Sequence, residues 1–305
     1  MRDATAGDPI TGLKWTHKSL RALARQLQRH AHQISAPTVG RLLAERGYAL
    51  RANQKQRASK QSPGRDEQFG YIAELRAMFL KRKRPVISVD SKKRELVGQF
   101  KQRGQQWRQS AHSVLIYDFR SDAVGIAIPY GIYDVRRNRG YIVVGTAHDT
   151  AQFAVAAIRS WWLQVARTSY PQARHLLIEA DCGGSNASTS RVWKEGLQNL
   201  ADEFALTITV THYPTGASKW NPIEHRCFNL ISGNWAGQPL DSYETILKFI
   251  RSTRSTTGFR CRARLDKREY PTGIKISQQQ VDAWRIDKHT LFPQWNYTVK
   301  PRRRR

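Results

Sequence analysis

The chain has 305 residues, of which 40% are hydrophobic and 25% charged, values typical of a globular protein with a sizeable core. No apolar run approaches the ~18 residues of a transmembrane helix, and the first 20 residues lack the apolar centre of a signal peptide. We therefore expect no membrane partner. The three cysteines lie far apart and fit neither a disulfide framework nor a zinc site, which favours a reducing compartment such as the cytoplasm.

Positive charge is concentrated at the two ends of the chain. In total, 51 Lys and Arg against 24 Asp and Glu give a net charge of +27. Residues 1–65 hold 13 Lys and Arg against 3 Asp and Glu, and residues 259–305 hold 13 against 4. Such charge is typical of nucleic-acid binding; solubility and anionic lipid are the alternatives, but no amphipathic membrane helix accompanies it.

Two short helices are predicted near the N-terminus, over residues 16–27 and 35–47. Thr16 is the expected cap of the first helix, and Ser35 is a favourable N-cap for the second. Two helices joined by a short turn form a helix-turn-helix, whose second helix enters the DNA major groove. Thr38 and Arg41 would then lie on its outer face and contact DNA. The alternative is an ordinary helical hairpin.

The rest of the chain predicts an α/β domain. Residues 51–68 have a linker composition, and residues 69–80 resume helical spacing. We expect strands at residues 86–89, 113–119, 124–128, 131–135, 141–146, 175–180 and 206–211. We expect helices at residues 149–167, 190–204, 221–231 and 242–254. This order predicts a mixed sheet flanked by helices on both faces, followed by a basic C-terminal extension at residues 259–305.

Acidic residues follow two of the apolar strands. Asp90 and Asp181 each end such a strand, where burial is costly unless the carboxylate is paired or binds a metal. Glu224, at the start of a predicted helix, is the expected third member of a site for Mg²⁺ or Mn²⁺. Glu179 is the nearest competitor, and the other acids in the region fit turns or helix caps: Asp118, Asp122, Asp134 and Asp149. The glycine turn at residues 183–186 fits either a phosphate site or a tight connection.

Several motifs together resemble the bacterial DDE transposases of the Rhodopirellula type. The motifs lie at residues 85–93 (PVISVDSKK), 95–100 (ELVGQF), 127–134 (AIPYGIYD), 148–150 (HDT), 179–186 (EADCGGSN), 218–226 (SKWNPIEHR) and 294–298 (QWNYT). The resemblance runs from about residue 13 to residue 301. It implies an RNase H-like fold, with Asp90, Asp181 and Glu224 as the catalytic DDE triad that binds two Mg²⁺ or Mn²⁺ ions.

The resemblance also implies an activity and a domain order. The expected protein is a bacterial, nucleoid-associated insertion-sequence transposase that cleaves double-stranded DNA at element ends and joins it to target DNA, acting as a homo-oligomer. Residues 1–50 would form the helix-turn-helix segment, 51–68 the linker and 69–258 the catalytic domain. The cations that flank the acids would contact DNA phosphates: Lys92, Lys93, Lys219 and Arg226.

Two other functions fit the same sequence. One is a nuclease with the same core that hydrolyses DNA without joining it. The other is an inactive copy that only binds DNA, although its acidic triad is intact. Relatives of this type carry further DNA-binding helices upstream, so we expect this chain to be a truncated copy or to begin at an alternative start.

Overall fold

The computed structural model describes residues 5–7, 14–16, 18–50 and 63–302. The chain divides into two compact units, Met1–Arg57 and Ala58–Arg305, which we describe separately. Most of the predicted linker, residues 51–62, lies outside the described residues. Within the described residues, no helix is long and apolar enough to cross a membrane.

The first unit contains a two-stranded sheet, β1 (Thr5–Gly7) and β2 (Lys14–Thr16), and two helices, α1 (Leu20–Arg29) and α2 (Ala36–Glu45). Thr16 lies in β2, so the predicted cap is wrong. Instead, the Ser19 hydroxyl accepts a hydrogen bond from the Ala22 N–H and caps α1. Ser35 caps α2 as predicted. The helices pack through a small core around Leu23, Ala24 and Val39, but this hairpin does not by itself establish DNA binding.

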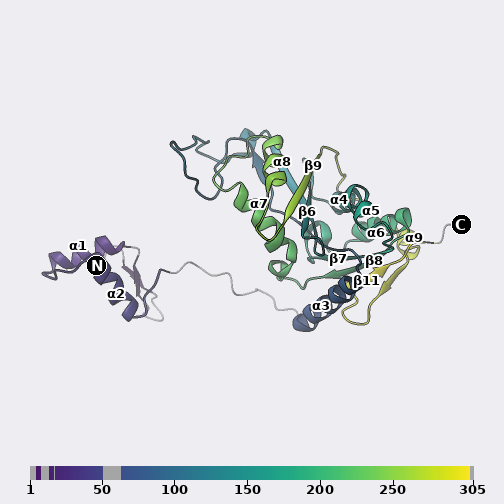
Figure 1. Cartoon of the computed structure of the whole chain (residues 1–305), viewed down its shortest axis with the longest axis horizontal. Coiled ribbons are helices and arrows are strands. Elements are labelled where there is room, and N and C mark those ends of the chain that lie inside the picture. The colour runs from purple at the N-terminus through teal and green to yellow at the C-terminus, as the bar shows by residue number, and fades with distance from the viewer. Residues whose placement is uncertain (1–4, 8–13, 17, 51–62, 303–305) are drawn as a thin grey trace. The chain divides into compact units, whose positions relative to one another are not determined.

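The second unit is built on a nine-stranded mixed sheet (Figure 1). Its strand order is β10-β11-β8-β7-β3-β5-β6-β9, with β4 paired to β5. The strands are β3 (Val86–Ser91), β4 (Glu95–Val97), β5 (Gly125–Asp134), β6 (Arg139–Gly145), β7 (His175–Ala180), β8 (Thr207–His212), β9 (Arg260–Asp266), β10 (Ile286–Lys288) and β11 (Asn296–Val299). The central strands β3, β7 and β8 are parallel, whereas β5 is antiparallel to both β3 and β6. This is the mixed α/β sheet expected from the sequence.

Helices cover both faces of the sheet, as predicted (Figure 1). One face packs against α4 (Ala151–Trp161) and α6 (Arg191–Phe204) in a core that includes Phe153, Trp161 and Trp193. The α4 helix continues through a π-helical turn, η3 (Trp162–Ala166), into α5 (Arg167–Ser169). The other face packs against α3 (Arg65–Lys81), a π-helical turn η6 (Glu224–Phe228), α7 (Asn229–Asn234) and α8 (Tyr243–Ser252).

Three segments differ from the prediction. Residues 113–119 form no strand, and Ile116 and Tyr117 are exposed because no neighbouring strand covers them. Residues 125–134 form one long strand where two shorter ones were predicted. The segment expected as a basic extension contributes β9, β10 and β11 to the sheet, together with the short helix α9 (Gln278–Asp282). Residues 260–299 therefore belong to the sheet domain.

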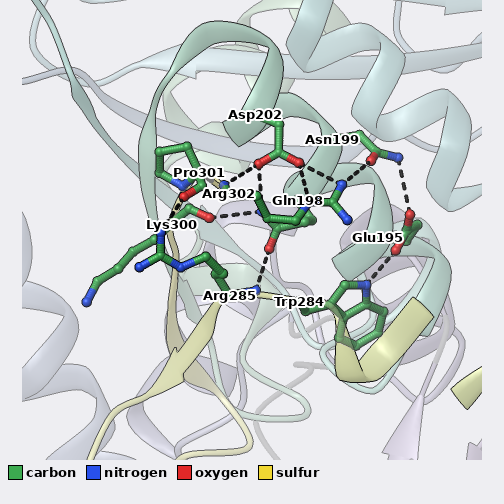
Figure 2. Close-up of polar contacts among 9 residues, drawn as sticks. All are labelled: Glu195, Gln198, Asn199, Asp202, Trp284, Arg285, Lys300, Pro301 and Arg302. Carbon is green, nitrogen blue, oxygen red and sulfur yellow. Dashed lines mark hydrogen bonds and ion pairs between the residues drawn. The ribbon is translucent and has the colours of Figure 1, made fainter. Parts of the chain in front are cut away.

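The C-terminal strands are fastened to α6 by polar contacts (Figure 2). The buried Gln198 amide donates to the Lys300 carbonyl at 2.9 Å and accepts from the Arg285 N–H at 2.8 Å. The Arg302 guanidinium forms an ion pair with Asp202 at 2.7 Å. The end of the described chain is therefore held against α6, and the Arg302 charge is already partnered.

Candidate active site

Asp90 lies in β3, and Asp181 directly follows the neighbouring parallel strand β7. Val89 of β3 is opposite Ala180 of β7, so the next residues along the two strands are the two aspartates. Asp90 is only 8% exposed, and its Oδ1 accepts a hydrogen bond from the Ser91 N–H at 2.7 Å. The sheet register therefore brings together two residues that are 91 positions apart in the sequence.

The two carboxylates, with Glu224, are electrostatically linked. Burial, together with the negative charges of Asp181, Glu224 and Asp149, raises the pKa of Asp90 to about 8. Burial also raises the pKa of Asp181 to about 6, against hydrogen bonds from Gly183 and Asn186 that lower it. Burial raises the pKa of Glu224 as well, while His225 and Lys92 lower it. Each of these groups is therefore costly to ionise without a nearby cation.

Asn221 fixes the start of the Glu224 turn onto β3. The Ser88 hydroxyl donates to the Asn221 amide oxygen and accepts from the Ile223 N–H at 2.9 Å. The Asn221 amide nitrogen donates to the Val89 carbonyl at 3.0 Å. Asn221 is fully buried, so these bonds are shielded from water. They tie the segment before Glu224 to the strand that carries Asp90.

A second hydrogen-bond chain supports the backbone at Asp181. His212 Nδ1 bonds to the Asp181 carbonyl oxygen at 2.7 Å, and His212 Nε2 lies 3.2 Å from the Tyr297 hydroxyl. The Trp193 indole N–H donates to the same hydroxyl at 2.9 Å. Burial lowers the pKa of His212 to about 4, so its neutral ring donates to the carbonyl. These hydrogen bonds could not be predicted from the sequence, because the residues that form them come from β8, β11 and α6.

Glu179, the nearest competitor to the triad, has a different environment. It is fully buried, and its two carboxylate oxygens accept from Arg76 of α3 at 2.7 and 2.6 Å. The Tyr213 hydroxyl donates to one of the same oxygens at 3.2 Å. This pairing satisfies the Glu179 charge and fastens α3 to β7, which is a structural role.

Asp149 and the glycine turn lie closer to the site than the sequence indicated. The Ser91 hydroxyl donates to Asp149 Oδ1 at 2.9 Å and lies 3.2 Å from the Ser185 hydroxyl. The Tyr130 hydroxyl donates to the Asn186 amide oxygen at 2.7 Å. The side chains of the turn are thus engaged with β3 and β5, which favours a tight connection over a phosphate site. Asp149 precedes the Thr150 cap of α4, which is why it resembled a cap residue.

The carboxylates suit a hard divalent cation. Asp181 Oδ1 is buried and accepts no hydrogen bond from the described residues. A cation would satisfy this oxygen and also offset the raised pKa of Asp90 and Asp181. In the described part of the chain, no three His, Cys, Asp or Glu side chains are already gathered into a metal-holding group. The acids are thus close enough to interact but are not gathered into a closed set of ligands.

A basic cleft of about 1060 Å³ opens beside Glu224. Six cations line it: Lys92, Lys93, Arg94, Lys101, Arg103 and Lys219. Lys92 is paired with Glu95 at 2.8 Å and lies over the Trp235 ring, so it is held by the protein. Lys93 and Lys219 are exposed. Arg226 is exposed but does not line the cleft.

The other predicted DNA contacts lie on α2. The Thr38 hydroxyl is 2.9 Å from the Ser35 hydroxyl, and Arg41 is paired with Glu45 one turn later. Arg41 is exposed and Thr38 is half-buried. Arg41 is therefore accessible, whereas Thr38 is partly engaged at the start of the helix.

The family model described as "Rhodopirellula transposase DDE domain" matches residues 1–301. The chain belongs to this family. Similar solved structures include a Mos1 transposase paired-end complex with left transposon end (15% identity, TM-score 0.48) and a pre-cleavage Mos1 transpososome (16% identity, TM-score 0.46). Each match covers 76% of this chain and 65% of the Mos1 chain. The search of curated proteins found no match.

Proposed function

We propose that this member of the DDE transposase family cleaves DNA at the ends of a bacterial insertion sequence and joins them to target DNA. The observation that supports this most is the adjacency of Asp90 and Asp181 in the sheet register, with Glu224 interacting electrostatically with both beside a basic cleft. Residues 1–50 would contribute DNA recognition, and the sheet domain would carry the chemistry. The protein would act as a homo-oligomer on double-stranded DNA.

In this proposal the triad holds two Mg²⁺ or Mn²⁺ ions. When bound, such ions stabilise charge on a scissile phosphate and favour deprotonation of the attacking water or 3′-hydroxyl. Asp90 and Asp181 supply the buried carboxylates, and Asn221 keeps Glu224 close to them. Lys93 and Lys219 line the cleft and would offset the charge of the DNA backbone near the reacting phosphate.

The test is to remove each triad charge while keeping its shape. We expect Asp90→Asn, Asp181→Asn and Glu224→Gln each to reduce cleavage and joining at least ~100-fold, because each would lose a metal-binding oxygen charge. Folding and duplex binding should persist. Asp118→Asn is the matched control, since Asp118 lines the same cleft but lies outside the triad; it should cleave at nearly the normal rate.

Two results would contradict the proposal. Near-normal cleavage in any one triad variant would remove that residue from the catalytic site. If the unmodified protein cleaves DNA but does not join pre-cleaved element ends to target DNA, it is a nuclease instead.

A further inference from the structure

A second basic cavity lies at the edge of the sheet, away from the triad. It measures about 380 Å³ and is formed by the first residues of β6 and β9, the end of α4 and the segment after α8. Six arginines line it: Arg137, Arg139, Arg251, Arg254, Arg260 and Arg262. No acidic residue lines it, and none of the six forms an ion pair with a carboxylate of the described residues.

The strand register forces these like charges together. Arg139 of β6 is directly opposite Arg260 of β9, and Arg254 forms an isolated bridge to Arg260 from the other side. Like charges directly opposite on paired strands are destabilising. Because all three side chains are exposed, the repulsion is partly screened by solvent. An anion bound among them would convert this repulsion into attraction.

Half of the six arginines are available to a ligand. Arg251 donates Nε and a terminal nitrogen to the Ala263 carbonyl at 3.0 and 2.9 Å, and Arg139 donates to the Gly258 carbonyl at 2.6 Å. Arg137 makes a long contact with the Ser169 carbonyl. By contrast, the side chains of three have no hydrogen-bond partner among the described residues: Arg254, Arg260 and Arg262. Arg260 and Arg262 alternate with the buried Cys261 and so project from the same side of β9.

The cavity is separate from the triad. Across the sheet, Arg260 of β9 is in register with Arg139 of β6, Asp134 of β5 and Ile87 of β3. Asp90 therefore lies three strands away from Arg260 and three residues further along β3. At ~3.3 Å per residue and ~4.8 Å per strand, the two places are on the order of 17 Å apart. The parallel strands begin near the cavity and end near the triad. An anion in the cavity is therefore not the phosphate undergoing reaction.

We propose that the arginine cavity binds backbone phosphates of a duplex DNA segment that lies outside the catalytic cleft. The inference rests on the proposed function for the identity of the partner. Arginine suits this ligand because its planar guanidinium binds phosphate oxygens through two parallel hydrogen bonds. Such contacts would position the DNA on the sheet domain without reading its sequence.

The test is duplex binding at several salt concentrations. The variant Arg254→Gln/Arg260→Gln/Arg262→Gln should bind both element-end and scrambled duplexes about 10-fold more weakly near 0.15 M salt, with the salt slope reduced by about 2 to 3. Its cleft and triad are unaltered. The matched control is Arg191→Gln/Lys275→Gln/Lys288→Gln, which removes the same charge from exposed positions outside the cavity. It should weaken binding less than about 3-fold.

Equal weakening in the two triple variants would overturn the inference, because bulk charge alone would explain it. A second pair of results would also overturn the inference: calorimetry shows micromolar binding of tripolyphosphate in the cavity, and the Arg254/Arg260/Arg262 variant still binds duplex normally. The site would then bind a free polyphosphate rather than DNA. The proposed function fails in a different experiment, if the triad variants cleave DNA at nearly the normal rate. Duplex binding is measured without any cleavage, so the two failures are distinguishable.

Discussion

Asp90 gives the metal-free protein a stability that depends on pH. Its pKa is about 8 in the folded state against an ordinary value of 3.8. The folded protein therefore retains a proton that the unfolded chain releases, so the free energy of unfolding falls as pH rises toward 8. Asp181 also makes the free energy of unfolding fall as pH rises, but only up to about pH 6. His212 acts in the opposite sense, but only between about pH 4 and its ordinary value of 6.5.

We predict that, in EDTA, the melting temperature falls between pH 6.5 and 8 and that Asp90→Asn removes most of this fall. Millimolar Mg²⁺ or Mn²⁺ should raise the melting temperature most at the high end of this range, because the metal requires the ionised carboxylate. Differential scanning fluorimetry at matched ionic strength would measure both effects. An identical pH slope in the Asp90→Asn variant would show that another group carries it.

Single residues differ in how far the sequence predicts them. The proximity of Asp90 and Asp181 could be predicted, because an acid directly after a buried apolar strand is unusual on its own. Asp149 and His212 could not, because their contacts with Ser91 and the Asp181 carbonyl depend on strand pairing. Lys92 looked like a free DNA contact, but its pairing with Glu95 depends on how the chain continues along β5 from β3 into β4.

At the scale of elements, α3 is fastened to β7 through one buried ion pair. Arg76 and Glu179 meet with side chains that are 28% and 0% exposed. We predict that Glu179→Gln lowers the free energy of unfolding by about 1–3 kcal/mol, because the amide retains part of the hydrogen bonding but loses the charge. Arg76→Ala should lower it by about 3–5 kcal/mol, because it leaves a buried carboxylate unpaired.

Both variants should still cleave DNA within a few-fold of the normal rate at a temperature where they remain folded. Asp181→Asn should show the reverse pattern, with little loss of stability and loss of cleavage. Urea denaturation combined with a cleavage assay would separate the two roles. Loss of cleavage in fully folded Glu179→Gln would mean that Glu179, rather than a triad member, belongs to the active site.

The elements that the sequence predicted well are those with an apolar period of their own. These elements are well buried, so their apolar residues form a clear pattern in the sequence: strands β3, β7 and β8 and helices α4 and α6. Strand β9 was missed because Arg260, Arg262 and Arg264 alternate with its buried residues, as an edge strand allows. The opposite error arose at residues 113–119, whose strand-like composition has no partner strand to pair with.

At the scale of the whole molecule, the positive charge divides into structural and available parts. Arg302 is held by Asp202 (Figure 2). Arg76 is held by Glu179, so both charges stabilise the fold. The terminal arginines at 303–305 lie outside the described residues, and the cavity arginines carry no ion pair with a described carboxylate. Net charge alone therefore overstates how many cations remain for DNA, and each must be assigned from its contacts.

We predict that the C-terminal arginines contribute affinity for any DNA, whereas α2 contributes discrimination between DNA sequences. Replacing Arg303, Arg304 and Arg305 with Gln should weaken binding to element-end and scrambled duplexes alike and flatten the salt slope by about 2 to 3, because phosphate contacts carry no sequence information. Thr38→Ala/Arg41→Ala should instead reduce the preference for element ends, since a base-edge contact contributes about 1–3 kcal/mol of discrimination. Competition titrations with both duplexes at several salt concentrations measure the two effects.

The structure supplies the controls for this experiment. Arg302→Ala should mainly lower the melting temperature, because Arg302 is paired with Asp202. Glu45→Gln releases Arg41 from its partner and should not reduce the preference for element ends. Because the Thr38 hydroxyl contacts the Ser35 cap, circular dichroism must show that α2 remains helical in the double variant. A folded double variant with unchanged preference for element ends would exclude this face of α2 as the surface that reads the DNA sequence.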